Sequence, residues 1–329
     1  MPAAVPIPAD LQRRYGNSSE RRAWLAGLPA LVSECLQRWN LRVTLAPGQE
    51  PWNGSAGIVV PVLDDDGAPA VLKVAFPYAE TLLEPVALRL WAGNGAVRLL
   101  HADEQRCAMV LERMDAGRWL HSVPMDEATA VWGSLVRQLS LVPDDRPDWA
   151  ALPHIAETAE RWSDDLPAEW ERLGRPFDRW LLETALEVCQ TRGAVGRRVA
   201  KDVLVHSDLH YMNILGRSGT DDYAAIDPQP TIGEAEFGVA PCLWNRIPDL
   251  SRTDPQPALR ARCAELSSAA GLDGELARQW SIAREVDNAL WYFSKPGHGG
   301  DAARSLWVAS TLAGRTLDGL PTAHQLKTL

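Results

Sequence analysis

The sequence lacks several features that would assign it to a specialised class of protein. Its five cysteines are scattered and none forms a CxxC pair, so neither a zinc site nor a disulfide framework is indicated. No apolar run approaches the roughly 18 residues of a membrane span. Residues 1–10 lack the basic start and apolar run of a signal peptide. We therefore expect a cytoplasmic protein that does not act at a membrane.

An excess of positive charge is also absent. The chain has 33 Lys and Arg against 43 Asp and Glu, which gives a formal net charge of -10. This balance argues against DNA or RNA as a partner and permits a small or cationic one. With 46% hydrophobic and 23% charged residues, the composition is that of a globular protein. The length of 329 residues favours two lobes over one core, while monomer and homodimer both remain open.

The expected secondary structure changes character near residue 114. Before it, we expect a helix at 20–40, strands at 41–46, 57–63 and 70–76, a helix at 78–92 that ends at Gly93, and strands at 97–101 and 107–113. After it, we expect helices at 126–139, 155–173, 177–192, 258–270, 275–292 and 302–313, with short strands at 203–205 and 223–226. The sequence therefore predicts an α+β fold with a small β-rich lobe, 1–114, and a larger, mainly helical lobe, 115–329.

The most informative segment is a polar loop, HSDLHYMNIL, at residues 206–215. It carries Asp208 and, five residues later, Asn213, and a second strand ends in AIDP with Asp227. Phosphoryl transfer from ATP needs a carboxylate that orients or deprotonates the acceptor hydroxyl, together with oxygen ligands for Mg²⁺. Asp208 suits the first role, and Asn213 and Asp227 suit the second. The pattern indicates an ATP-dependent phosphotransferase.

These motifs resemble the aminoglycoside phosphotransferases, and most closely the aminoglycoside/hydroxyurea resistance kinase family. That family shows H-G-D-L-H-x-x-N, I-D-P-K-P-x-x-G-E and a later N-R, which correspond here to HSDLHYMN, IDPQPTIGE and NR. Further matches upstream extend the resemblance over about residues 40–250: AVLKV, ALRL, GAVRL and LER. Ser207 replaces the usual Gly, which matters if that position needs a positive φ. Gln229 replaces the usual Lys and removes a positive charge.

The resemblance implies a protein-kinase-like fold with ATP and Mg²⁺ as cofactors. It implies that Lys73, in an apolar strand, contacts the α- and β-phosphates and is steadied by a glutamate of the next helix. Glu84 is preferred for that partner over Glu80, which lies one turn earlier on the same face. It further implies a phosphate-covering loop at residues 52–57, which contains Gly54 and Ser55. The strand 109–113, with Glu112, would lead to the hinge where backbone groups meet adenine.

The implied acceptor is an aminoglycoside such as streptomycin, phosphorylated at a hydroxyl group and so inactivated as an antibiotic. The candidate acceptor residues follow the metal segment or lie on a late helix: Glu234, Glu236, Asn245, Arg246, Asp287 and Trp291. Asp287 and Trp291 are one helical turn apart, a pair that suits a sugar or a guanidinium group. The alternative for this pair is a core tryptophan beside a solvated carboxylate.

Three other interpretations remain open. His206, Asp208 and His210 alternate along an extended segment, as the ligands of a metallohydrolase do, although no further ligands are evident. In the kinase interpretation the two histidines hold the loop by hydrogen bonds. A kinase of the same fold that phosphorylates an amino sugar or another metabolite is the second alternative, and a nucleotide-binding pseudokinase is the third.

Overall fold

The computed structural model describes residues 5–16, 18–46, 48–54, 56–197 and 201–328. It divides into two compact units. The first unit comprises Met1–Gly117 and Gly216–Gln229, and the second comprises Arg118–Leu215 and Pro230–Leu329. Residues 216–229, which the sequence analysis places in the larger lobe, thus group with the first unit.

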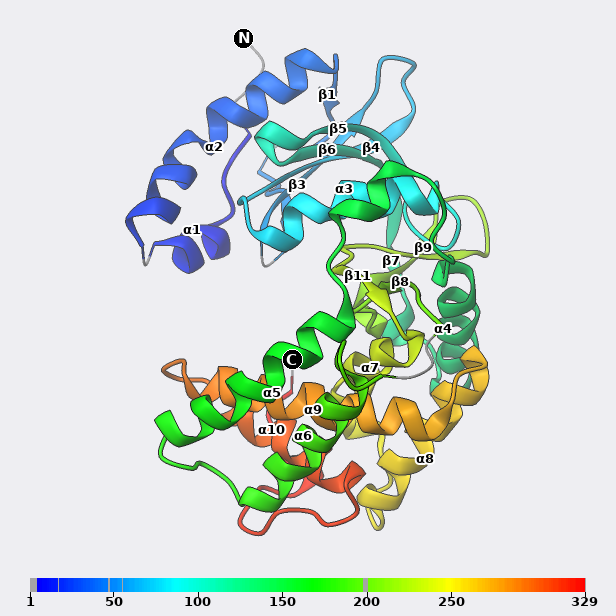
Figure 1. The fold of residues 1–329 in the computed structure, drawn as a ribbon. Helices are drawn as coiled ribbons and strands as arrows, with labels where there is room; N and C mark the ends of the chain where they lie inside the picture. The colour runs from blue at the N-terminus through cyan, green and yellow to red at the C-terminus, as the bar shows by residue number, and fades with distance from the viewer. Residues whose placement is uncertain (1–4, 17, 47, 55, 198–200, 329) are drawn as a thin grey trace. The chain divides into compact units, whose positions relative to one another are not determined.

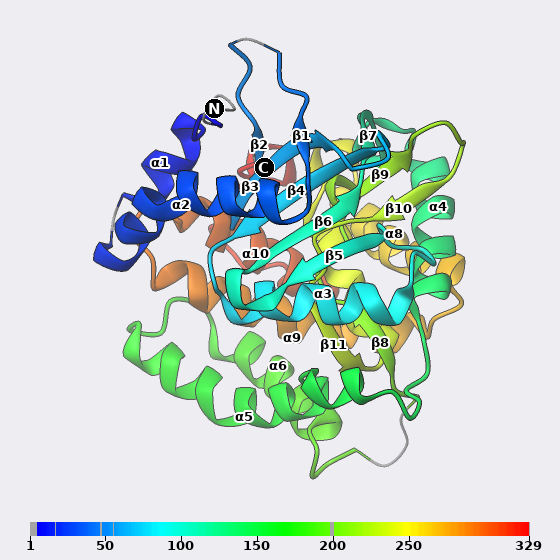
Figure 2. The same cartoon turned by 90° about the horizontal axis from the view of Figure 1, so that it is seen from above.

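The first unit is built on an antiparallel sheet in the order β1-β3-β4-β6-β5, with β2 paired to β3 (Figure 2). The strands are β1 (Arg42–Val43), β2 (Trp52–Asn53), β3 (Gly57–Leu63), β4 (Pro69–Ala75), β5 (Leu99–Asp103) and β6 (Ala108–Glu112). The predicted hairpin joins β3 to β4, where the Asp64 N–H donates to the Ala68 carbonyl at 3.0 Å. Gly67 in this turn has φ +81°, which glycine adopts without strain. Strand β4 lies between β3 and β6, and its side chains from Ala70 to Ala75 are buried.

Three helices accompany this sheet: α1 (Ala9–Tyr15), α2 (Ser19–Arg38) and α3 (Ala79–Trp91). The Ser18 hydroxyl caps α2 by accepting from the Arg21 N–H at 3.2 Å. Leu28 and Val32 of α2 belong to the same buried core as Ile58 of β3. The sequence predicted α2 and α3 and missed α1. Helix α3 ends one residue before the predicted Gly93, because Ala92 already takes the left-handed conformation (φ 49°).

The second unit is mainly helical. Its helices are α4 (Met125–Leu139), α5 (Ile155–Arg172), α6 (Arg179–Arg192), α7 (Ala240–Trp244), α8 (Pro255–Ala270), α9 (Gly274–Phe293) and α10 (Gly299–Leu312). Helix α9 contacts α5, α6, α7, α8 and α10, and Figure 1 shows α5 and α6 beside it. Trp280, Ile282, Val286 and Leu290 are buried along α9. This helix is therefore the core of the second unit.

Short strands frame the polar loop of residues 206–215. Strand β8 (Val203–His206) pairs antiparallel with β11 (Pro230–Gly233), so that His206 lies opposite Pro230. A three-stranded sheet has the order β10-β9-β7, with β7 at Met114–Trp119, β9 at Ile214–Arg217 and β10 at Tyr223–Ala225. The sequence missed β7, β9 and β11, which are short or rich in polar residues.

The predicted α+β class is confirmed, since a sheet-rich unit is followed by a larger helical one. Across the residues that the structure describes, no helix has the length and apolar character needed to span a membrane.

Candidate functional site

Lys73 lies between two carboxylates in the first unit. Its ammonium Nζ is 2.6 Å from Oε2 of Glu84 and 2.7 Å from Oδ1 of Asp227. Lys73 comes from β4, Glu84 from α3, and Asp227 from the segment just after β10. The structure thus brings together three residues that the sequence assigned to nucleotide and metal binding, and it selects Glu84 over Glu80 as the lysine's partner.

Burial and charge act in opposite directions on this triad. Burial alone would lower the pKa of Lys73, but the carboxylates of Asp227 and Glu84 outweigh it and raise that pKa, so the lysine stays charged. Glu84 is 2% exposed, and its burial raises the pKa of its carboxyl group, against the opposing effect of Lys73. Asp227 keeps 46% of its side chain exposed. Of the two carboxylates, Asp227 is therefore the one that a cation from solvent can reach.

The backbone around Asp227 is held by the loop that follows α3. The Val97 N–H donates to the Ala225 carbonyl at 2.8 Å, and the Ala225 N–H donates to the Gly95 carbonyl at 2.9 Å. Asp227 itself has φ 56°, a left-handed conformation that aspartate tolerates better than most residues. The same helix–loop segment therefore carries Glu84 and fixes the strand that delivers Asp227.

Arg217 is a structural residue that the sequence analysis missed. Its guanidinium pairs with the Glu112 carboxylate and donates to the carbonyls of Gly93 (2.7 Å) and Ala96 (2.8 Å). Glu112 also accepts from the Arg98 N–H at 2.7 Å. The Glu112 side chain thus ties strands together, while the expected contact of this strand's backbone with adenine stays a prediction. A single arginine at the end of a short strand carries no sequence signal for such a role.

The predicted phosphate-covering loop, residues 52–57, includes the strand β2 and the first residue of β3. The Gly54 N–H donates to the Gly57 carbonyl at 3.2 Å, and the Gly54 carbonyl accepts from Arg14 of α1 at 2.8 Å. Gly57 is required for close packing, because a Cβ there would lie 2.2 Å from the Val74 carbonyl oxygen. Ser55 lies outside the described residues. Its assignment, like that of Gly54, stays a prediction.

The Asp208 loop lies in the second unit and is held at successive peptides. The Asp208 N–H donates to Nδ1 of His206 at 3.3 Å, and the Asp208 carbonyl accepts from Nδ2 of Asn213 at 2.9 Å. The Leu209 carbonyl accepts from Nε1 of Trp132 at 2.9 Å. Nε2 of His210 lies 3.8 Å from Oδ2 of Asp208. His206 and Asn213 thus hydrogen-bond the backbone of Asp208, whereas the 3.8 Å between His210 and the Asp208 carboxylate is longer than a hydrogen bond.

Ser207 does not strain this loop. The non-glycine residues with positive φ among those described do not include Ser207, so its conformation is open to any L-residue. The Ser207 carbonyl accepts from Nη1 of Arg284 at 2.8 Å. The replacement of the family's glycine is therefore compatible with the backbone at this position.

The described residues contain no group of three or more His, Cys, Asp or Glu side chains arranged to hold a metal ion. The metallohydrolase interpretation of His206, Asp208 and His210 requires such a group. A magnesium site made of one carboxylate, one amide oxygen and nucleotide phosphates does not require a group of three such side chains.

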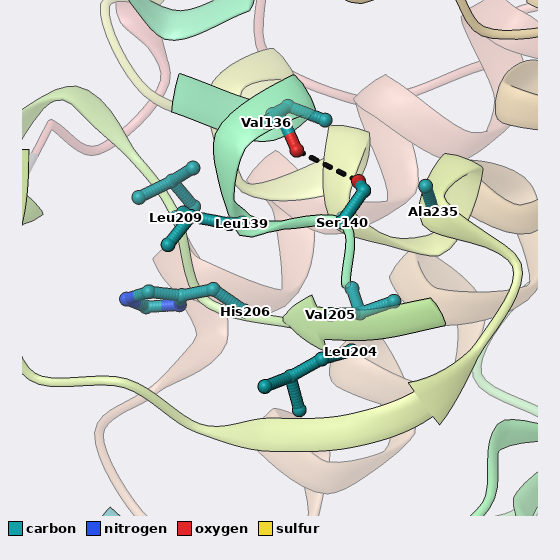
Figure 3. A pocket seen from close by; sticks show the side chains of 9 residues that line it. Val136, Leu139, Ser140, Leu204, Val205, His206, Leu209 and Ala235 are labelled. Carbon is teal, nitrogen blue, oxygen red and sulfur yellow. Dashed lines mark hydrogen bonds between the residues drawn. The ribbon is translucent and has the colours of Figure 1, made fainter. Parts of the chain in front are cut away.

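A small apolar cavity lies behind the Asp208 loop (Figure 3). Leu139 and Ser140 of the α4 end, Val205 and His206 of β8, and Leu209 line it, and the Ser140 hydroxyl turns back to the Val136 carbonyl at 2.7 Å. Its volume is about 10 Å³, at the lower limit for a single water molecule. It is a packing gap and not a ligand site.

Two of the predicted acceptor residues have structural partners. Glu234 is 5% exposed and accepts from Nε1 of Trp280 at 2.7 Å, with Arg192 at 3.4 Å. Glu236 accepts from the Asp273 N–H at 3.1 Å. These contacts hold the segment after β11 against α9 and α6.

The other four predicted acceptor residues line two separate cavities of the second unit. Asn245 and Arg246 line one of about 350 Å³, and Arg246 is paired with Asp249 at 2.6 Å. Asp287 and Trp291 of α9 line another of about 370 Å³. The structure therefore divides the predicted acceptor set between two places.

The cavity lined by Asp287 and Trp291, which we call the α5–α9 cavity, is acidic and aromatic. Asp165 and Glu169 of α5 line its other wall, and Trp291 is 53% exposed. Burial raises the pKa of Asp287 to about 6, with a further increase from Asp165 and an opposing effect of Arg284. Basic groups share this site, because Arg172 also lines the cavity and donates to Glu169, and the Lys295 ammonium lies 5.4 Å from the centroid of the Trp291 ring.

Comparison with known proteins gives consistent relationships. The family model for aminoglycoside/hydroxyurea antibiotic resistance kinases matches residues 42–295. Streptomycin 6-kinase from Streptomyces griseus is 37% identical over 294 residues, covering 87% of this chain and 91% of that protein. Hydroxyurea phosphotransferase from Kitasatospora aureofaciens is 35% identical over 321 residues, covering 95% of this chain and 87% of that protein.

Solved structures confirm the predicted protein-kinase-like fold. An ethanolamine kinase from Plasmodium vivax has a TM-score of 0.58 at 15% identity, with 95% of this chain and 94% of that one covered. Aminoglycoside phosphotransferase APH(4)-Ia, in a ternary complex with AMP-PNP and hygromycin B, has a TM-score of 0.56 at 14% identity, with 86% and 96% covered. From the family match and the identity to its members, the chain belongs to the aminoglycoside/hydroxyurea antibiotic resistance kinases and is a phosphotransferase with an alcohol group as acceptor.

Proposed function

We propose that this kinase transfers the γ-phosphoryl group of ATP to a hydroxyl group of an aminoglycoside such as streptomycin. The observation that carries the proposal is the Lys73 ammonium held within 2.7 Å of both Glu84 and Asp227. A buried lysine fixed in this way presents a permanent positive charge to phosphate oxygens. Relatives named for streptomycin phosphorylation share 37% of their residues with this chain over most of its length.

In this proposal Lys73, Glu84 and Asp227 of the first unit, with Asn213 of the second, act on the nucleotide side of the reaction. Lys73 holds the phosphates, and Glu84 keeps its side chain in place. Asp227 and Asn213 offer a carboxylate and an amide oxygen, the donor types that Mg²⁺ prefers. Bound Mg²⁺ would supply charge neutralisation for the phosphates.

Asp208 supplies the acceptor side. Its carboxylate orients the acceptor hydroxyl and takes its proton as the new O–P bond forms and the bond between the γ-phosphorus and the β–γ bridging oxygen breaks. The products are ADP and the phosphorylated acceptor. His206 and Asn213 support this role, because His206 accepts from the Asp208 N–H and Asn213 donates to the Asp208 carbonyl, which fixes the peptides on either side of this residue.

Hydroxyurea is the second candidate acceptor. A relative named for its phosphorylation is 35% identical and spans 95% of this chain. An amino sugar or another metabolite is a third. Hydroxyurea and an amino sugar differ from an aminoglycoside in charge and size, so a comparison of acceptors distinguishes the three candidates.

The decisive experiment is an ATP-consumption assay with an acceptor panel of streptomycin, hydroxyurea and a simple amino sugar. We expect streptomycin to be phosphorylated and Asp208→Asn to abolish turnover while nucleotide binding persists. Turnover of hydroxyurea or the sugar alone would refute the aminoglycoside proposal. Nucleotide binding without turnover of any acceptor would instead favour a pseudokinase.

A further inference from the structure

Arg284 of α9 reaches the backbone next to Asp208. Its Nη1 donates to the carbonyl of Ser207 and to that of Phe237, each at 2.8 Å. The guanidinium carbon lies 4.4 Å from the centroid of the Phe237 ring. The Arg284 guanidinium thus makes two hydrogen bonds and a cation–π contact, which together leave it little freedom to move.

The Phe237 ring, which Arg284 contacts, is itself held in place by two other rings. The Phe237 ring packs edge-on against Trp280 at 5.1 Å and stacks with Trp162 at 6.2 Å. Trp280 is buried in α9 and donates to Glu234. Arg284 is thus anchored to the helical core, and its bond to Ser207 transfers that rigidity to the loop.

Three carboxylates also act on the charge of Arg284. Burial lowers its pKa, and the charges of Asp208, Glu285 and Asp287 oppose that effect. Asp287 is three residues further along α9 and so lies on the same face as Arg284. That aspartate lines the α5–α9 cavity. One arginine therefore connects the loop of Asp208 with the helix that carries the acidic cavity.

The Ser207 peptide is the link that leads directly into Asp208. The same peptide group carries the Asp208 N–H, which donates to Nδ1 of His206 at 3.3 Å, so Arg284 and His206 hold its two edges. The bond from Trp132 to the Leu209 carbonyl acts two peptides later. Losing the shorter bond, to the Ser207 carbonyl, would leave this peptide held only by its longer bond to His206, so the peptide could tilt and displace the Asp208 carboxylate.

We propose that Arg284 is a positioning residue, which fixes the Ser207 peptide so that the Asp208 carboxylate meets the acceptor hydroxyl in a productive geometry. The proposal rests on the catalytic role of Asp208 in the proposed function. Arg284 then affects the rate of phosphoryl transfer but not the binding of the nucleotide. A displacement of about 1 Å in a reacting group costs roughly 100-fold in rate.

The test compares Arg284→Met and Arg284→Lys with a matched control, Arg278→Met. Arg278 lies on the same helix and donates to the Leu312 carbonyl at 2.8 Å, so its loss also removes an arginine–carbonyl bond from α9. For each variant, kcat, the KM values for ATP and for streptomycin, and Tm are measured.

We expect Arg284→Met to lower kcat about 100-fold with the KM for ATP within about 2-fold of wild type. Arg284→Lys should recover part of the rate, because its ammonium can still donate to a carbonyl. Arg278→Met should keep the wild-type kcat. Equal kcat in folded Arg284→Met and wild type, or equal losses in the two methionine variants, would overturn the proposal. If the wild type turned over no acceptor, the proposed function itself would fail, which is a different result.

Discussion

The Lys73 ammonium lies 2.7 Å from the carboxylate of Asp227, a residue 154 positions away in the sequence. Glu84 holds the same ammonium from the other side at 2.6 Å. One ammonium group thus pairs with two carboxylates. The triad carries a net negative charge when both carboxylates are ionised, so phosphates alone would be repelled from it. A divalent cation at the exposed Asp227 would remove that repulsion.

Lys73→Met is expected to remove nucleotide binding and to destabilise the protein. It leaves the Glu84 carboxylate buried without its cation, and breaking such a pair typically costs about 3–5 kcal/mol. Thermal unfolding and the binding of a fluorescent ATP analogue check both effects. Lys201→Met, at an exposed position, is the control and should match wild type. Wild-type ATP affinity in Lys73→Met would contradict the assigned role.

Asp227→Asn is expected to separate metal dependence from folding. The Lys73–Glu84 pair remains, so Tm without ligands should change little. In wild type, ATP with Mg²⁺ should raise Tm, and EDTA should remove both that increase and the turnover. In Asp227→Asn, Mg²⁺ should add no stabilisation beyond that of ATP alone. A full Mg²⁺-dependent shift in the variant would show that the metal is held elsewhere.

The parts of the site that could be predicted from the sequence are those with a local pattern. Lys73 interrupts an apolar strand and Glu84 lies on the next helix, both of which the local pattern showed, while their pairing was expected from the family resemblance. Gly57, β3 and β4 were likewise found because a turn separates two β-branched runs. Helix α1 was missed, because Ala9–Tyr15 has only seven residues, four of which have charged or amide side chains.

Long-range contacts left no such pattern. Arg217 meets Glu112 across 105 residues, and no neighbouring residue marks either of them as a partner. Arg284 was missed for the same reason, since its two acceptors are backbone carbonyls and any residue supplies those. The acceptor set combined residues that follow the metal segment with Asp287 and Trp291, which were chosen because they lie one turn apart on a late helix. Because α9 packs against α5, Asp287 lines a cavity that Asn245 does not.

Arg217→Met is expected to lower the stability of the first unit. The change removes an ion pair with the half-buried Glu112 and two bonds to the carbonyls of Gly93 and Ala96. Charge-assisted hydrogen bonds contribute about 1.5–3 kcal/mol each at most, and we expect a loss of about 3 kcal/mol in total. Urea unfolding measures it. Because the Gly93–Ala96 loop also holds the strand before Asp227, the KM for ATP should rise as well. A loss of stability without a higher KM would show that this loop does not position Asp227.

Asp287→Asn is expected to weaken a cationic acceptor selectively. If the α5–α9 cavity binds the guanidinium groups of streptomycin, loss of this carboxylate should raise the KM for streptomycin about 10-fold, or about 1.4 kcal/mol. The KM for ATP should not change. Since burial raises the pKa of Asp287 to about 6, the wild-type KM should fall as pH increases from 5 to 7, and the variant should lose that dependence. Glu171→Gln, which alters an α5 carboxylate outside the cavity lining, is the control. An unchanged KM in Asp287→Asn would place the acceptor elsewhere.

Glu285→Gln is expected to stabilise the protein at alkaline pH. Glu285 is fully buried in α9, and this burial raises the pKa of its carboxyl group to about 7 against the effects of Ser305 and Arg284. A raised pKa in the folded state means that folding favours the protonated form, so its contribution is complete below the ordinary carboxyl pKa and is lost as pH rises through about 7. Glutamine mimics the protonated form at every pH. The variant should therefore match wild type near pH 5 and exceed it at pH 8 by on the order of 2 kcal/mol, as urea unfolding at both values would show.

The control variant for that experiment, Glu275→Gln, should show the opposite dependence of stability on pH. Glu275 begins the same helix, and its hydrogen bond to Arg278 lowers the pKa of its carboxyl group. Its contribution is present above the ordinary carboxyl pKa and is lost as pH falls, so Glu275→Gln should be less stable than wild type at neutral pH and approach it in acid. If Glu285→Gln followed this second pattern, Glu285 would be ionised in the fold, and the charges of Arg284 and Arg304 would then outweigh its burial.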